Sequence, residues 1–298
     1  MYLSIDYRTR FAYPEPVRQS HNELRAAPTS NATQRLLSYR FQSVPASRPL
    51  TYVDYWGTLV DAFGVRRPHS RLDIVVEAVV ETQARTTVAD APRPALDDPS
   101  YLDRYWEYLQ PSPHVELTDE VRELARDASA PARTAIELLQ ALSEITGARL
   151  DYVPGSTHIG ESVHAILTKG SGVCQDYAHV LVALCRASGL AARYVSGYLY
   201  AADHHAGPSE EDQPITVQTH AWVEARIPGS GWLAVDPTNQ QIVGERHVSI
   251  GAGRDYDDVA PLRGIYTGGT VPDHEADVEM RRLVDPAPSI IDQRSQQQ

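Results

Sequence analysis

The chain has 298 residues, of which 42% are apolar and 22% are charged, and it contains 21 Pro and 18 Gly. This is the balance of an ordinary globular protein that is long enough for two domains, and it excludes global disorder. The 39 acidic residues outnumber the 27 basic ones, and the resulting net charge of −12 disfavours binding to nucleic acids and to anionic membranes.

The first eight residues, Met1-Tyr-Leu-Ser-Ile-Asp-Tyr-Arg8, have no basic run followed by a long apolar stretch. They therefore match neither a secretory signal nor a transmembrane helix. We expect a cytoplasmic protein with no membrane association.

Residues 1–88 are predicted to form a β-rich domain. Short runs of β-branched and aromatic residues, such as Tyr2–Tyr7, Leu59–Phe63 and Leu72–Thr82, are separated by Pro and Gly. Residues 89–117 shift to Pro, Asp and Tyr, a composition typical of a connector.

A second domain of mixed helices and strands, an α+β fold, is predicted over residues 118–284, with a flexible tail at 285–298. Thr118 precedes acidic residues and then Val and Leu at helical spacing, which indicates a capped helix, and residues 132–146 repeat the pattern. Further helices and strands are predicted at 163–167, 173–188, 191–200, 217–227 and 232–235.

Cys174 is the candidate nucleophile. It lies two residues after Gly172, in the first turn of the predicted helix, where unpaired N–H groups and the helix dipole favour a thiolate. The alternative is a small buried residue, but a cysteine that only packs in the core has no need of the preceding Gly-Ser-Gly, which lets a substrate backbone approach closely. Cys185 lacks these surroundings and is assigned to the core. Two cysteines so spaced suit neither a disulfide framework nor a zinc or redox pair.

His220 is the candidate base among eleven histidines. It belongs to the strand-like segment Thr219–Ala225, and a tight turn then leads to a second strand that ends at Asp236. Pairing residue 226 with residue 232 around a five-residue loop places His220 and Asp236 on one face, about 7 Å apart at the backbone. A four-residue loop would put them on opposite faces, so the hypothesis requires an odd loop or a bulge.

Other polar residues near these positions have simpler interpretations. His179 points away from Cys174 around the helix and is predicted to pack in the core. Asp176 lies in the first helical turn, where a capping charge is at least as plausible as a catalytic one. His204 and His205 fall in a polar segment that favours a loop beside the site, with zinc binding as a weak alternative. We expect no metal and no cofactor.

Four blocks occur in order along the chain: Gly172-Val-Cys-Gln-Asp-Tyr-Ala-His179, Arg193-Tyr-Val-Ser-Gly-Tyr198, Thr219-His-Ala-Trp-Val-Glu224 and Gly231-Trp-Leu-Ala-Val-Asp-Pro-Thr-Asn239. Together they resemble the bacterial transglutaminase-like cysteine peptidases. The segment Gly253–Gly264 looks like the one that follows the core in those proteins, and residues 1–85 resemble their β-rich N-terminal region by looser features.

The resemblance implies a papain-like transglutaminase core, in which a helix bearing the cysteine packs on an antiparallel sheet. It maps the nucleophile to Cys174, the base to His220 and the orienting acid to Asp236. A thioester formed on Cys174 would pass to water, giving a peptidase or amidase, or to an amine, giving a transglutaminase. Hydrolysis of a peptide or protein amide is preferred, because many bacterial members of the group look like cysteine peptidases.

Several roles stay open at this point. The N–H of Cys174 is one candidate oxyanion donor, and Gln175 or an upstream residue, with Gly172 near the site, is the other. Trp222 and Trp232 could line the substrate groove or pack in the hairpin core. A non-catalytic binding or assembly protein and an acyltransferase that uses a thioester donor are the rival functions, and the N-terminal domain could dock a protein partner.

Overall fold

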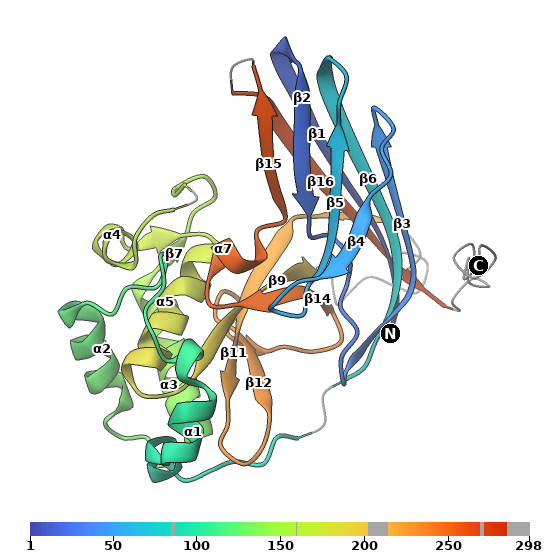
Figure 1. Cartoon of the computed structure of the whole chain (residues 1–298). Helices are drawn as coiled ribbons and strands as arrows, with labels where there is room; N and C mark the ends of the chain where they lie inside the picture. The colour runs from blue at the N-terminus through green and yellow to red at the C-terminus, as the bar shows by residue number, and fades with distance from the viewer. Residues whose placement is uncertain (85–86, 159, 202–213, 269–270, 285–298) are drawn as a thin grey trace.

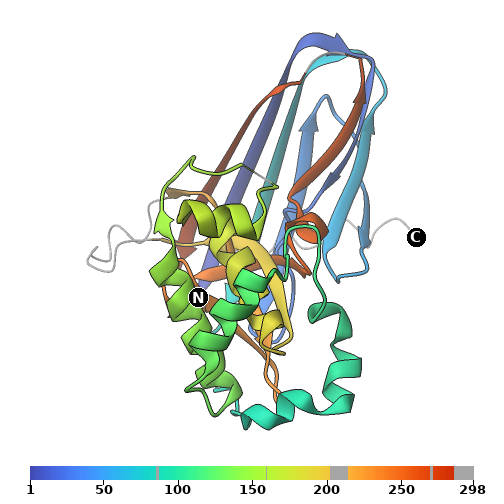
Figure 2. The same ribbon diagram turned by 90° about the vertical axis from the view of Figure 1, so that its left-hand side faces the viewer.

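The structure is a computed structural model that describes residues 1–84, 87–158, 160–201, 214–268 and 271–284. Two β-sheets pack face to face at one end of the molecule, and a third sheet lies between them and a layer of helices (Figures 1 and 2). The fold is thus the mixed α and β architecture expected from the sequence, with a β-rich N-terminal region.

The two packed sheets form a sandwich around one apolar core. Residues of β1 alternate between buried and accessible, as a strand with one face on a core must. In spatial order, the first sheet contains β10 (Ile215–Val217), β16 (Asp273–Leu283), β1 (Tyr2–Val17), β6 (His69–Thr82) and β3 (Gln34–Val44), and the second contains β15 (Leu262–Thr267), β2 (Gln19–Leu24), β5 (Leu59–Val65) and β4 (Leu50–Val53).

The third sheet carries the helices on one face. Its strands, in order, are β13 (Gln241–Ile242), β12 (Trp232–Asp236), β11 (Thr219–Arg226), β9 (Ala192–Leu199) and β14 (His247–Gly253). The short strands β7 (Asp151–Tyr152) and β8 (Ser171–Gly172) pair in parallel with each other. The helices are η1 (Arg93–Asp97), α1 (Pro99–Arg104), η2 (Trp106–Tyr108), α2 (Asp119–Ser129), α3 (Ala135–Arg149), α4 (Val163–Lys169), α5 (Cys174–Ala187) and α7 (Tyr256–Val259).

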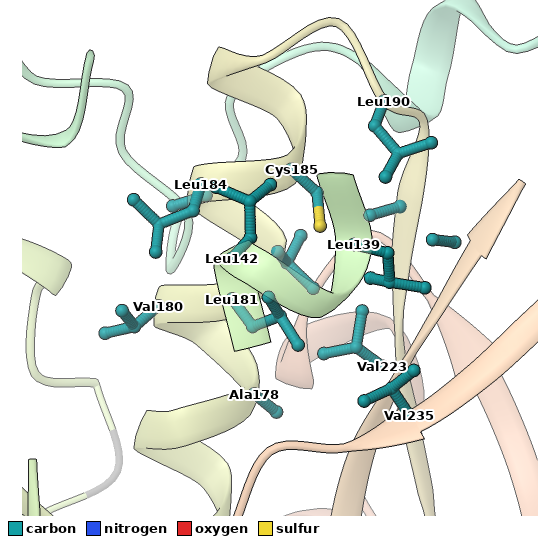
Figure 3. Close-up of a cluster of buried hydrophobic side chains, with 14 of the residues drawn as sticks. Leu139, Leu142, Ala178, Val180, Leu181, Leu184, Cys185, Leu190, Val223 and Val235 are labelled. Carbon is teal, nitrogen blue, oxygen red and sulfur yellow. The ribbon is translucent and has the colours of Figure 1, made fainter. Parts of the chain in front are cut away.

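Helix α5 is the centre of this half of the molecule. Every residue from Asp176 to Arg186 is buried, because β9 and β11 cover one side and α2, α3 and α4 cover the other. Cys185 points into the apolar cluster with Leu139, Leu184 and Val223 (Figure 3), and burial raises the pKa of its thiol to about 12. The assignment of Cys185 to the core is confirmed.

The domain limits expected from the sequence differ from the observed pairing in two places. Residues 262–283, assigned to the second domain, instead supply β15 and β16, which pair with β2 and β1 of the N-terminal sandwich. Residues 89–117 are not a bare connector, because they form short helices whose Leu96 and Tyr101 are buried in the helical core. The expected tail, 285–298, lies outside the described residues.

The sequence signals fail there because both features depend on partners far along the chain. Strand β16 pairs with β1 across more than 260 residues, from Tyr2 opposite Leu283 to Ala12 opposite Asp273. The alternation of buried and exposed residues along β16 is weak, since most of its residues remain accessible.

Among the described helices, no segment is long and apolar enough to cross a membrane.

Candidate active site

Cys174 is the first residue of α5 and is half-buried. The chain reaches it through Gly170, whose left-handed backbone (φ 68°) ends α4, and through the short strand β8. Among the described residues, the backbone N–H groups of Cys174 and Gln175 have no hydrogen-bond partner, since the first N–H that bonds within the turn is that of Asp176. Two free donors therefore lie beside the thiol.

Asp176 folds back to cap the same helix. Its Oδ2 accepts hydrogen bonds from the N–H of Val173 at 2.7 Å and from the hydroxyl of Thr157 at 2.6 Å. Burial raises the pKa of Asp176 despite these bonds. This is the capping role, and it also ties the 153–158 loop to the start of α5.

Gly172 is buried against that carboxylate. A Cβ atom at this position would lie 2.7 Å from both Cβ and Oδ2 of Asp176. The glycine is therefore required by the packing of the helix cap, which differs from the close substrate approach expected from the sequence. Gln175 is half-buried, and its side chain makes no hydrogen bond to the described residues.

His220 and Asp236 lie together on adjacent strands, as the predicted hairpin requires. Arg226 pairs with Trp232 around a five-residue loop, and Val223 pairs with Val235, so the parity prediction is confirmed. The imidazole Nε2 donates to Oδ2 of Asp236 at 2.8 Å, and the two side chains are 10% and 0% exposed. Such a bond fixes the orientation of the ring.

The same ring faces Cys174. The thiol lies 4.0 Å from the carbonyl oxygen of Thr219, next to His220 at the start of β11. Burial opposes protonation of His220, but hydrogen bonds to Asp236 and to Cys174 raise its pKa to about 9. An imidazolium is thus favoured at neutral pH between a thiol and a buried carboxylate.

Comparisons with known proteins give matches over both halves of the chain. Residues 122–237 match the model of the transglutaminase-like superfamily, and residues 3–81 match the bacterial transglutaminase-like N-terminal region. An uncharacterized protein of Mycobacterium leprae is 35% identical over 282 residues, covering 94% of this chain and 99% of its own. The chain belongs to the transglutaminase-like superfamily.

Two more proteins are similar to this transglutaminase-like chain, one in structure and one over a short stretch of sequence. The crystal structure of a "Putative Cysteine Protease" from Cytophaga hutchinsonii has a TM-score of 0.72 and 20% identity, covering 98% of this chain and 96% of that one, which shows a shared fold. A "Protein-glutamine gamma-glutamyltransferase" of Pseudomonas aeruginosa is 40% identical over 74 residues, 24% of this chain and 10% of that protein.

Asp236 of the transglutaminase-like core is held by five donors. Oδ1 accepts the N–H groups of Thr238 and Asn239, and Oδ2 accepts the Asn239 amide at 2.7 Å and His247 Nε2 at 3.2 Å in addition to His220. Burial alone would raise the pKa of Asp236, yet these bonds, led by that of His220, hold it well below its usual range. The carboxylate therefore stays charged at any working pH.

His247 on β14 was not found from the sequence. It is 6% exposed, and its Nδ1 accepts the N–H of Gly244 at 3.4 Å, so the ring proton sits on Nε2 and points at Asp236. The nitrogen and oxygen atoms of His220, Asp236 and His247 lie within 4.8 Å of one another, close enough for a metal ion. Hydrogen bonds to the shared carboxylate already account for this grouping.

The two tryptophans pack against neighbouring side chains. Trp222 is 1% exposed and packs against His247 and Gly197, where a Cβ atom would lie 2.4 Å from its ring. Trp232 begins β12, four residues or about 13 Å from Asp236, and Arg193 lies 4.2 Å above its ring. Their geometry agrees with the packing role that the sequence left open beside groove lining. His204 and His205 lie outside the described residues.

Replacing His247 by Phe is expected to lower turnover by about tenfold, because Asp236 loses one of the donors that fix its position and therefore orients His220 less well. The pH–rate profile should shift with it, since a carboxylate that has lost one donor is a stronger acceptor for His220 and raises the pKa of that imidazole further. His247→Gln, which can still donate an N–H, should recover most of the rate. A profile identical to wild type for His247→Phe would show that His247 only fills space.

Proposed function

We propose that this protein is a cysteine-dependent amide hydrolase, a peptidase or amidase. The observation that carries the proposal is the buried His220–Asp236 pair set against a half-buried cysteine at a helix start. Cys174 is the nucleophile, His220 the acid and base, and Asp236 the group that orients the imidazole.

The reaction proceeds in two steps. The Sγ of Cys174 attacks the amide carbon, the oxygen takes up negative charge, and collapse breaks the C–N bond while the imidazolium of His220 gives its proton to the leaving amine. Water then attacks the thioester and gives one proton to His220, and cleavage of the C–S bond releases a carboxylic acid and restores the Cys174 thiolate beside the imidazolium. The partnerless N–H groups of Cys174 and Gln175 supply the donors for the oxyanion.

Access by water favours hydrolysis. Tyr152 and Val153, at the start of the loop beside Cys174, are 50% and 43% exposed. A thioester formed next to this loop is therefore open to solvent. An amine reaching the same thioester would give transfer instead.

Amine transfer is the second candidate. It is favoured by the 74-residue match to the Pseudomonas aeruginosa glutamyltransferase. A non-catalytic scaffold is the third, and it requires an unreactive Cys174.

One experiment distinguishes these three functions. The protein is incubated with N,N-dimethylcasein, with and without monodansylcadaverine, and the products are analysed by mass spectrometry. We expect peptide-bond cleavage or loss of side-chain ammonia that needs no amine and is absent with Cys174→Ala. Dansylated glutamine formed faster than hydrolysis would establish the transferase. If neither condition gives a product, and no acyl adduct is found on Cys174, the result would support the scaffold function.

A further inference from the structure

An open trough of about 640 Å³ crosses the outer face of the second sheet of the sandwich, away from the apolar core. This sheet is the front layer at the top of Figure 1, formed by β15, β2, β5 and β4. Six side chains define the walls of what we call the basic trough: His21, Arg48, Leu50, Arg66, Arg263 and Ile265.

The register of the strands creates the trough. Ala62 and Gly64 of β5 lie on the outer face, between inward residues such as Phe63. Because these two residues carry almost no side chain, β5 forms a low floor. His21 stands opposite Gly64 on β2, and Leu50 stands opposite Ala62 on β4, so the neighbouring strands rise as walls.

The trough is basic in an acidic protein. Arg48, Arg66 and Arg263 are exposed, and none of their guanidinium groups has a hydrogen bond or ion pair to the described residues. Glu23 is the acidic residue at this surface, and its carboxylate already accepts hydrogen bonds from Arg25 at 3.3 Å and from the hydroxyl of Tyr52 at 3.1 Å. Three guanidinium groups are thus free to bind carboxylates, in a chain whose net charge is −12.

The walls also carry apolar surface. Leu50 is 72% exposed and Ile265 is 73% exposed, on opposite sides of the floor. β4 pairs only with β5 among the described strands, which leaves its outer edge open for an added strand. These features suit an extended chain that alternates apolar and acidic side chains. They suit a nucleic acid poorly, since the aliphatic side chains of Leu50 and Ile265 cannot donate hydrogen bonds to a phosphate backbone.

We propose that the basic trough docks an extended acidic peptide segment of a partner protein, with carboxylates on Arg48, Arg66 and Arg263 and an apolar side chain between Leu50 and Ile265. This binding does not depend on the catalytic activity proposed above. It gives the N-terminal region a recruiting role separate from the cysteine site.

The test uses the full chain with Cys174→Ala, so that no peptide is consumed. A fluorescein-labelled dodecapeptide of alternating Glu and Leu is titrated by fluorescence anisotropy at low salt, beside peptides of alternating Glu and Ser and of alternating Lys and Leu. We expect binding of the Glu–Leu peptide, at least about tenfold weaker binding of Glu–Ser, and none of Lys–Leu. Affinity should fall as salt rises.

Matched variants locate the site. Arg48→Glu combined with Arg263→Glu should weaken the Glu–Leu peptide by about tenfold or more, and Leu50→Ser with Ile265→Ser should do so without changing the salt dependence. Arg122→Glu is the control, because Arg122 is an exposed arginine on α2 without an ion pair to the described residues. Circular dichroism checks that each variant is folded.

Three results would overturn the proposal: equal loss in Arg122→Glu, tighter binding of a single-stranded oligonucleotide than of the Glu–Leu peptide, or a dimer in sedimentation that the Arg48 and Arg263 changes dissociate. The last result would assign the trough to a second copy of the chain.

Discussion

Iodoacetamide is expected to alkylate Cys174 rapidly from pH 6 to pH 9 and to leave Cys185 unmodified in the native protein. Cys174 lies at a helix start and faces an imidazole whose pKa is raised to about 9, so a positive charge lies beside the sulfur through this range and favours its reaction. Cys185 is fully buried and its pKa is raised to about 12. Peptide mapping by mass spectrometry after timed alkylation gives both rates.

His220→Ala should slow the labelling of Cys174 at pH 6 by about 30-fold, because an ordinary thiol is almost wholly protonated at that pH. At pH 9 the His220→Ala variant should be alkylated at Cys174 at a rate close to that of the wild-type protein. Labelling of the wild-type protein that simply rises near pH 8.5, and that is indifferent to His220→Ala, would identify an ordinary thiol and favour the scaffold function. For the active enzyme, amide turnover should also fall above about pH 9, where His220 no longer holds the proton for the leaving amine.

Asp236→Asn is expected to lower the free energy of unfolding by about 3–5 kcal/mol near pH 6 and to abolish most turnover. The carboxylate is fully buried, and an amide has only one acceptor oxygen, so its NH2 group would have to face either the two histidines or the N–H groups of Thr238 and Asn239. Urea unfolding followed by tryptophan fluorescence measures the loss.

The pH dependence of that loss has a definite sign. The pKa of His220 is raised in the folded protein. Its contribution to the free energy of unfolding is therefore complete below about pH 6.5 and disappears as pH rises through about 9. The pKa of Asp236 is lowered, so its contribution is present above about pH 4 and disappears as pH falls. The difference between wild type and Asp236→Asn should therefore be largest between about pH 4 and pH 6.5 and narrow towards pH 9 and above.

Glu224→Gln is the control for Asp236→Asn. Glu224 lies on β11 like His220, but its ion pair with Arg193 is partly exposed, at 17% and 23%. Its loss should cost less than about 1 kcal/mol and leave turnover unchanged. If Asp236→Asn cost no more than this control, the buried pair would not be a source of stability, and its role in orienting His220 would be in doubt.

Local sequence determined the chemistry of the site. The helix start at Cys174 follows from apolar spacing and a preceding glycine loop, which act within a few residues. The contact between His220 and Asp236 follows from strand alternation and the length of one hairpin loop, so parity alone could predict it. Both are short-range geometry, which a sequence expresses directly.

Tertiary structure decided what surrounds and supports that site. His247 reaches Asp236 only because β14 pairs with β9 on the far side of β11, and β16 completes the first sheet by pairing with β1 from the other end of the chain. The basic trough exists because β15 joins β2, a pairing across about 240 residues. Such strand pairings depend on backbone hydrogen bonds that any sequence can make, so their partners and register are fixed by the packing of the whole fold.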